Sequence, residues 1–214
     1  MTTTLRPTRP RENFTVDGLT RTPPTAGTTT TTAVIGSEET RAQRWTRYLA
    51  AVTRISLGWV FLWAFLDKLL ALGHETGVDP KTGAVDYFGA AAWIHGGSPT
   101  QGFLGFATKG PLAGFYQNLA GNPVVDWLFM LGLLGIGLAL ILGVGMRMAA
   151  VAGTALLVMM WSAVLPPANN LFMDDHLIYA MILGVLAFIG AGKTFGLGKR
   201  WERIPFVRDH GILK

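Results

Sequence analysis

Two acidic residues and a histidine follow one another at the start of the last apolar segment, in the sequence PPANNLFMDDH. Asp174 fits an ordinary helix cap, because a carboxylate accepts hydrogen bonds from the free N–H groups of a helix N-terminus. Asp175 and His176 exceed what a cap requires. Histidine exchanges protons at neutral pH, which suits a quinone site, where electron transfer is matched by proton transfer. Tyr179, one helical turn further on, could complete this site or simply pack.

Two cations lie on the first apolar segment. Arg54 and Lys68 are fourteen residues apart, about four helical turns, so they point to nearly the same face. Between them the same face carries Gly58, Phe61 and Phe65. Such a line of cations and aromatics suits an anionic headgroup, an anionic substrate or a quinone ring. The alternative is that each cation reaches the membrane surface from its own end of the helix.

Metal and haem chemistry has few candidate ligands. The chain has no cysteine, which excludes disulfides, thiolate zinc sites, iron–sulfur clusters and c-type haem attachment. Its four histidines never share a helix at three- or four-residue spacing. A mononuclear site of His176, Asp175 and either His74 or His95 is the remaining metal alternative. We expect neither a metal nor a haem.

The composition predicts a membrane protein that is all-α. Of the 214 residues, 50% are hydrophobic and only 14% are charged, whereas a soluble domain carries nearly twice that charged fraction. Four apolar segments are long enough, or nearly so, to cross a bilayer, which takes about 20 residues. They cover residues 48–72, 124–145, 148–165 and 176–191. We therefore expect a four-helix transmembrane bundle over residues 48–195.

The two ends of the chain differ from this membrane domain. Residues 1–47 contain fifteen threonines and no long apolar run, which predicts a disordered tail. Residues 196–214 form a basic tail. With both termini in the cytoplasm, fourteen Lys and Arg lie inside and three outside, so the positive-inside rule favours a multi-pass protein of the cytoplasmic membrane with this orientation. The net charge of +5 then reflects the orientation of the chain in the membrane and contact with lipid headgroups. We expect no nucleic-acid partner.

The outer loop, residues 73–123, is too long to be a plain connector. Within it, DYFGAAAWIHG and GPLAGFYQNLAGNP are predicted to form interfacial helices, because their aromatic residues favour the membrane surface. In the second span, Gly135, Ala139 and Gly143 recur every four residues, the spacing that lets helices approach closely.

Several longer motifs occur together in this chain. They are FLDKLL, SPTQGFLGFATKGPLAGF, GNPVVDWLFMLGLLGIGLALILGVGMR, WSAVLPPANNLFMDDHLIYA and GKTFGLGKRW. In this order they resemble the DoxX/DoxD family of four-span membrane proteins, over roughly residues 45–203. The DoxD branch is the membrane subunit of thiosulfate:quinone oxidoreductase, which oxidises thiosulfate to tetrathionate and passes the electrons to quinone. The resemblance implies a lipid bilayer, a quinone and a second protein subunit as partners.

Together, the residues and the resemblance predict the membrane subunit of a quinone-linked oxidoreductase. The expected catalytic residues are Lys68, Asp175 and His176, and the expected quinone-binding residues are Arg54, Trp59 and Tyr179. The outer face carries seven acids against three lysines, which disfavours the thiosulfate dianion more than a quinone. The alternatives are a non-catalytic anchor or accessory subunit of a redox or respiratory assembly and, more weakly, a small transporter.

Overall fold

A computed structural model describes residues 39–168 and 170–214, and this part of the chain is helical without a strand. Four helices are long: α1 (Arg41–Leu70), α3 (Pro123–Leu142), α4 (Met146–Ala163) and α5 (Asp175–Phe188). The short helices are α2 (Ala113–Gln117), α6 (Gly198–Trp201) and α7 (Pro205–Asp209). Single turns complete the set, at η1 (Trp93–His95), η2 (Phe103–Ala107), η3 (Ala191–Lys193) and η4 (Gly211–Leu213). The expected all-α class is confirmed.

The first long helix begins earlier than its apolar run. Thr40 accepts a hydrogen bond from the backbone N–H of Gln43, and the Gln43 side chain accepts one from the N–H of Thr40. This reciprocal capping box fixes the start of α1 at Arg41, so residues 41–47, expected in the tail, are helical. The expectation for residues 1–38 lies outside the described part of the chain.

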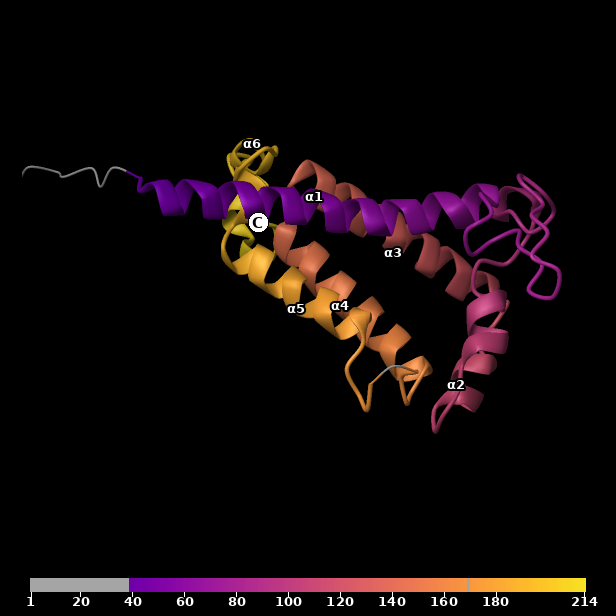
Figure 1. Cartoon of the computed structure of the whole chain (residues 1–214). Coiled ribbons are helices and arrows are strands. Elements are labelled where there is room, and N and C mark those ends of the chain that lie inside the picture. Colours follow the sequence, from indigo (N-terminus) through magenta and orange to yellow (C-terminus); the bar gives the residue numbers. More distant parts are fainter. Residues whose placement is uncertain (1–38, 169) are drawn as a thin grey trace, which may run out of the picture. The chain divides into compact units, whose positions relative to one another are not determined.

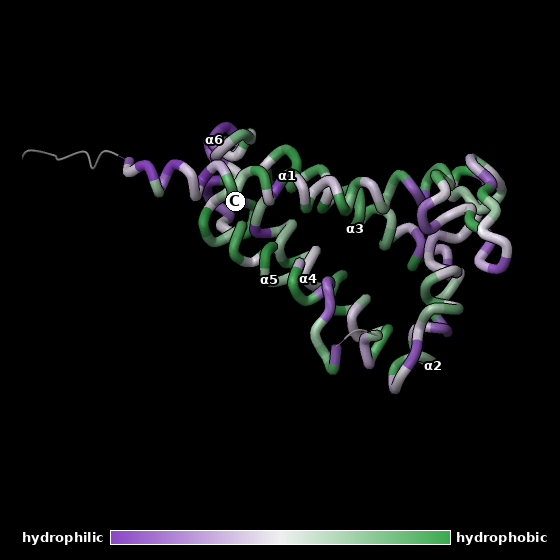
Figure 2. The backbone as a smooth tube through the Cα atoms, in the orientation of Figure 1, coloured by the Kyte–Doolittle hydropathy of each residue, from purple (hydrophilic) through white to green (hydrophobic). Residues whose placement is uncertain are grey.

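Three helices, α1, α3 and α4, are long and apolar enough to cross a membrane. Only 28%, 33% and 33% of the residues in their most apolar stretches are buried within the protein. Many apolar side chains of these helices are exposed, among them Leu128 and Leu131 of α3 and Val151 of α4. Hydrophilic residues gather at the helix ends and in the segments between the helices, as Figure 2 shows. This pattern fits a lipid bilayer around the helices. With 14 residues, α5 is shorter than the other three.

The helices α1 and α3 pack against each other as an antiparallel pair. A Cβ atom added to Gly58 would lie 2.9 Å from the side chains of Leu140 and Ile141, and one added to Gly137 would lie 2.9 Å from the backbone nitrogen of Leu62. The backbones touch because both glycines lack a side chain. Gly135, predicted for this role, has open space around it, because helix rotation turns it away from α1.

The helices α4 and α5 form a second antiparallel pair. Gly153 of α4 lies against Leu183 of α5, and a Cβ atom there would also approach Ile136 of α3 and Phe61 of α1. All four long helices therefore meet at the level of Gly153. Figure 1 shows the two pairs diverging from each other toward the ends of α1 and α4.

The long helices of the described part of the chain run between two ends of the structure. One end, here called the base, holds the first turns of α1, residues 143–145 and residues 189–214 (Figure 1). The other, here called the loop end, holds residues 71–122 and 164–174. The predicted C-terminal tail is folded against the base, where Trp201 Nε1 donates to the Leu213 carbonyl and Arg147 Nη1 donates to the Gly211 carbonyl over 2.9 Å.

The loop end contains less regular helix than expected. The segment DYFGAAAWIHG holds only the single turn η1, because the left-handed Phe88 (φ 57°) and the extended Ala92 (ψ 138°) both interrupt a helical path. The predicted helix in GPLAGFYQNLAGNP is reduced to α2, between Gly110 (φ 77°) and Gly121 (φ 72°). The helix itself ends at Gln117, and residues 118–121 continue only as turns before the left-handed Gly121.

The contact between α1 and α3 can be tested with two glycines of one helix. We expect Gly137→Ala to destabilise the protein by about 1–3 kcal/mol, because the new methyl group meets backbone atoms that cannot move aside. The matched change Gly135→Ala should be neutral or stabilising by up to about 1 kcal/mol. Unfolding of the two variants in detergent, followed by circular dichroism, measures the difference; equal stabilities would contradict the packing described.

Candidate functional site

His176 and Asp174 form a hydrogen-bonded pair at the first turn of α5. One carboxylate oxygen of Asp174 accepts the Leu177 backbone N–H over 3.2 Å, which confirms Asp174 as the helix cap. The other lies 2.8 Å from His176 Nδ1. When Nδ1–H donates to this carboxylate, the opposite ring nitrogen of the neutral imidazole is left as an acceptor. Asp174 thus orients the ring as well as capping the helix.

A cavity of about 360 Å³ opens beside this pair. The end of α4 and the segment after it form one wall, and the start of α5 forms another. A third side comes from the outer loop, at Ala107 and Lys109. The cavity is lined by Ala107, Lys109, Val164, Pro167, Ala168, Met173, Asp174, Asp175 and His176. It therefore combines one cation, two carboxylates and a histidine with an apolar side.

Lys109 reaches the cavity because the outer loop is attached to the end of α4. Its backbone N–H donates to the Ala163 carbonyl over 3.0 Å. The next residue, Gly110, has a φ of 77°, and a Cβ atom there would lie only 1.9 Å from the Leu165 carbonyl oxygen. Only glycine allows this close approach of two backbones. The spacing of residues in the sequence does not predict this contact between residues 109–110 and residues 163–165, because the two segments are far apart in the chain.

Two further hydrogen bonds hold the segments around the cavity. The buried Tyr116 of α2 and Ser162 of α4 join through their hydroxyl oxygens at 2.6 Å. Trp161 Nε1 donates to the Phe172 carbonyl over 2.6 Å. The first bond attaches α2 to α4, and the second attaches the segment before α5 to the same helix. The cavity walls are therefore fixed to the last turns of α4.

The structure separates Lys68 from the other two expected catalytic residues. Asp175 and His176 line the loop-end cavity, but Lys68 lies on α1 near Asp67 and Glu75 and is not among the lining residues. Within the described residues, Lys68 is thus not placed at this cavity, and its expected catalytic role stays a prediction. Lys109 supplies the cation instead, because the outer loop folds back onto α4.

Asp67, beside Lys68, has a structural role that the sequence did not indicate. It is buried and accepts the backbone N–H groups of His74, Glu75 and Thr76, over 3.1, 3.1 and 2.9 Å. Asp126 acts similarly at the start of α3, where it accepts hydrogen bonds from Ser98 and Thr100. These two carboxylates fix the outer loop to α1 and α3.

The three residues expected to bind quinone lie in different surroundings. Arg54 is buried at the base, where Nη2 donates to the Phe195 carbonyl over 2.9 Å and to the Thr194 carbonyl over 3.3 Å. Trp59 is half exposed on α1 beside Trp63, with ring centroids 5.9 Å apart. Tyr179 packs against the apolar core. They do not form one binding site, because they face the base, the outside and the core respectively.

Metal ligands do not converge in the described residues. No group of three His, Cys, Asp or Glu side chains that could hold an ion occurs in residues 39–168 and 170–214. His176, Asp174 and Lys109 can provide hydrogen bonding, charge stabilisation and proton transfer at the loop end.

The attachment of Lys109 can be tested at Gly110. We expect Gly110→Ala to destabilise the protein by about 1–3 kcal/mol, because the methyl group strains a left-handed backbone and meets the Leu165 carbonyl. Gly114→Ala, in open space in α2, is the matched control and should be neutral or slightly stabilising. Thermal unfolding in detergent compares the two, and a Gly110→Ala variant as stable as the control would show that the loop does not dock here.

The chain was also compared with known proteins. No family model, no curated protein and no solved structure matches it. The resemblance of its motifs to the DoxX/DoxD family therefore stays a prediction from the sequence.

Proposed function

We propose that this protein binds a quinone headgroup in the loop-end cavity and serves as the membrane subunit of a quinone-linked oxidoreductase. The observation that carries the proposal is the His176–Asp174 pair, which lies with Lys109 around one cavity. A quinone accepts two electrons and two protons when it is reduced. It offers two carbonyl oxygens as acceptors, and the cavity offers two groups that can donate to them.

Each polar residue of the cavity has a distinct task in this proposal. The Lys109 ammonium donates a hydrogen bond to one carbonyl oxygen and stabilises negative charge that develops there. His176, when both ring nitrogens carry a proton, donates from Nε2 to the other oxygen and delivers that proton, while Asp174 accepts from Nδ1 and holds the ring in place. Asp175 is exposed at the rim and exchanges protons with water. Lys68 has no part in this site.

The apolar features around the cavity support a membrane-soluble ligand. Val164 and Met173 line it, and exposed apolar side chains continue along α4 and α5, including Val158 and Met181. A volume of about 360 Å³ falls within the range of small-molecule sites and suits a single substituted ring. The ring would lie in the cavity and the isoprenoid chain along the helices.

The electron donor in this proposal is thiosulfate, and it rests on the DoxD resemblance alone. Two thiosulfate anions lose one electron each and join through a new sulfur–sulfur bond to give tetrathionate. These two electrons, together with two protons taken up from water by way of His176, convert quinone to quinol. Lys109 is the cation that lines this cavity, whereas seven acidic residues lie at or beside the loop end. This negative charge would repel the thiosulfate dianion, so a second subunit that holds the donor fits the charge distribution better than this chain alone.

A second candidate function is a non-catalytic anchor or accessory subunit. The observation that favours it is the exposed aromatic and apolar surface of the outer loop, where Tyr87, Phe88 and Ile94 are each more than half exposed. Such a patch on a loop suits contact with another protein.

We further propose four crossings of the cytoplasmic membrane, with the base in the cytoplasm. Antiparallel contacts run along α4 and α5, from Gly192 beside Met146 at the base to Phe172 beside Trp161 at the loop end, so α5 and its flanking residues extend as far as α4. Outside Arg54, the described part of the chain has ten Lys and Arg at the base and three at the loop end. This asymmetry favours a cytoplasmic base.

Single cysteines introduced into this cysteine-free chain test the topology. We expect Thr82→Cys and Leu171→Cys to react with a membrane-impermeant maleimide in intact cells, because both residues are exposed at the loop end. Arg208→Cys, exposed at the base, should react only after the membrane is permeabilised. Leu171→Cys and Arg208→Cys reacting from the same side would exclude α5 as a crossing.

Quinone binding is tested with the purified protein and a soluble quinone in detergent. We expect Lys109→Ala to weaken binding by at least about tenfold, because it removes a charged hydrogen-bond donor. The matched control is Lys81→Ala, an exposed lysine of the same loop that does not line the cavity, and Lys68→Ala should also leave binding unchanged. A loss with Lys68→Ala but not with Lys109→Ala would contradict the proposed site.

Thiosulfate-dependent quinone reduction tests the activity itself. We expect His176→Asn to lower kcat by about 10²–10⁴-fold, with a smaller effect on quinone affinity, because the imidazole acts as the proton donor. Quinone binding without turnover would point to a missing catalytic subunit. A folded protein that neither binds nor reduces quinone would refute the site and favour the accessory function.

A further inference from the structure

A second cavity lies at the base, far from the residues of the proposed quinone site. It has a volume of about 440 Å³ and lies between the first turns of α1 and the segment that follows α5. Three of its lining residues are cationic and come from separate parts of the chain, namely Arg47, Lys193 and Lys199. None of its lining residues, all within the described part of the chain, is acidic.

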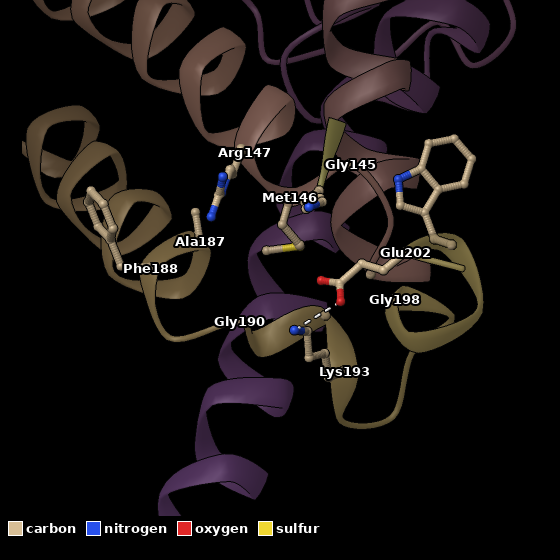
Figure 3. A pocket seen from close by; sticks show the side chains of 13 residues that line it. Gly145, Met146, Arg147, Ala187, Phe188, Gly190, Lys193, Gly198 and Glu202 are labelled. Atoms are coloured by element: carbon tan, nitrogen blue, oxygen red, sulfur yellow. Dashed lines mark ion pairs between the residues drawn. The ribbon is translucent and has the colours of Figure 1, made fainter. Parts of the chain in front are cut away.

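The three cations are only partly neutralised by nearby acids. Arg47 pairs with Glu39 over 3.1 Å, and Lys193 pairs with Glu202 over 3.0 Å, a contact drawn as a dashed line in Figure 3. Lys193 also lines the neighbouring cavity of about 290 Å³ that Figure 3 shows. Lys199 forms no ion pair within residues 39–168 and 170–214. The cavity therefore keeps a positive charge.

Arg54 adds a further positive charge behind the cavity wall. Its guanidinium is fully buried and donates to the carbonyl groups of Thr194 and Phe195, which themselves line the cavity. Its Nε and Nη1 atoms have no hydrogen-bond partner among the described residues. A buried cation without a carboxylate is costly, and an anion in the adjoining cavity would offset part of this cost.

The other side of the cavity is apolar and continues onto the outside of the helices. Tyr48 and Phe195 stack across it with ring centroids 5.3 Å apart, and Ile189 also lines it. Next to these residues, Leu49 is 65% and Phe188 is 94% exposed. A ligand of this cavity can therefore contact basic groups and the apolar helix surface at the same time.

We propose that the cavity binds the headgroup of an anionic phospholipid. The phosphate would lie among Arg47, Lys193 and Lys199, and the acyl chains would lie along Leu49 and Phe188. Basic pockets at the cytoplasmic ends of membrane helices recognise anionic headgroups in this way. A free phosphate ion would use the cations but leave the adjoining apolar surface uncovered, so a lipid matches the whole cavity better.

Lipid binding to the purified full chain in detergent tests this site. Native mass spectrometry compares phosphatidylglycerol with phosphatidylcholine of the same acyl chains. We expect wild type to prefer phosphatidylglycerol by at least about tenfold. Lys199→Gln should lower phosphatidylglycerol affinity about fivefold, and Lys193→Gln with Lys199→Gln about 25-fold, since each lysine near a membrane surface contributes roughly this factor. The single variant breaks no ion pair of the described chain.

The matched control is Arg203→Gln with Arg208→Gln, which removes two exposed cations of the base that do not line the cavity. In detergent no charged bilayer surface surrounds the protein, and neither arginine lines the cavity, so affinity should stay within about twofold of wild type. Two results would overturn the proposal: equal binding of the two lipids, or a loss of affinity in this control as large as in the Lys193→Gln with Lys199→Gln variant. The second result would mean that the lipid is attracted by the overall positive charge of the base and not by the cavity. Displacement of the lipid by excess inorganic phosphate would assign the cavity to a free anion. None of these measurements involves quinone.

Discussion

A polar group that enters the apolar layer of a membrane keeps its hydrogen bonds only if the protein itself supplies the partners. The long helices of this chain carry such groups near their ends, and folded segments supply hydrogen bonds to three of them. Asp67 binds the backbone of residues 74–76, Asp126 binds Ser98 and Thr100, and Arg54 binds the carbonyl groups of Thr194 and Phe195. The outer loop and the C-terminal segment are ordered around these contacts.

The outer loop is consequently a structural part of the fold as well as a connection. Two carboxylates hold it to the first helix pair, and the Tyr116–Ser162 hydrogen bond with the close contact at Gly110 holds it to α4. The loop thus joins two pairs of helices that diverge on its side (Figure 1). The cavity beside His176 exists because the loop completes a third wall.

The sequence predicted the features that depend on local patterns. Apolar runs gave the long helices to within a few residues at most boundaries, and Asp174 was expected as a cap because its position relative to the apolar run is typical of one. The start of α1 was missed although Thr40 and Gln43 have the spacing of a capping box. The capping box lies on the polar side of the apolar run, so the run by itself does not reveal it.

The features that depend on tertiary contacts could not be predicted. Gly135 and Gly137 look alike in the sequence, and only the rotation of α3 against α1 decides which one permits close packing. The distribution of Lys and Arg along the chain predicts that Lys68 and Lys109 both lie on the outer side. Which of them lies beside His176 depends on the loop folding back onto α4, a contact across more than fifty residues that has no periodic pattern.

Because the four long helices meet at Gly153, this level is the point about which one helix pair could rotate against the other. Ser162 lies nine residues beyond this level on α4, about 14 Å along the helix axis. A rotation of one pair against the other by about 5° about this fulcrum would displace Ser162 by about 1.2 Å, since displacement grows with distance from the pivot. That movement would part the Tyr116–Ser162 hydrogen bond while the contacts near Gly153 hardly changed. The loop is bound to α1 and α3 through Asp67 and Asp126 and to α4 through Ser162, so it would have to deform before the two pairs could rotate in this way, and it braces them against tilting.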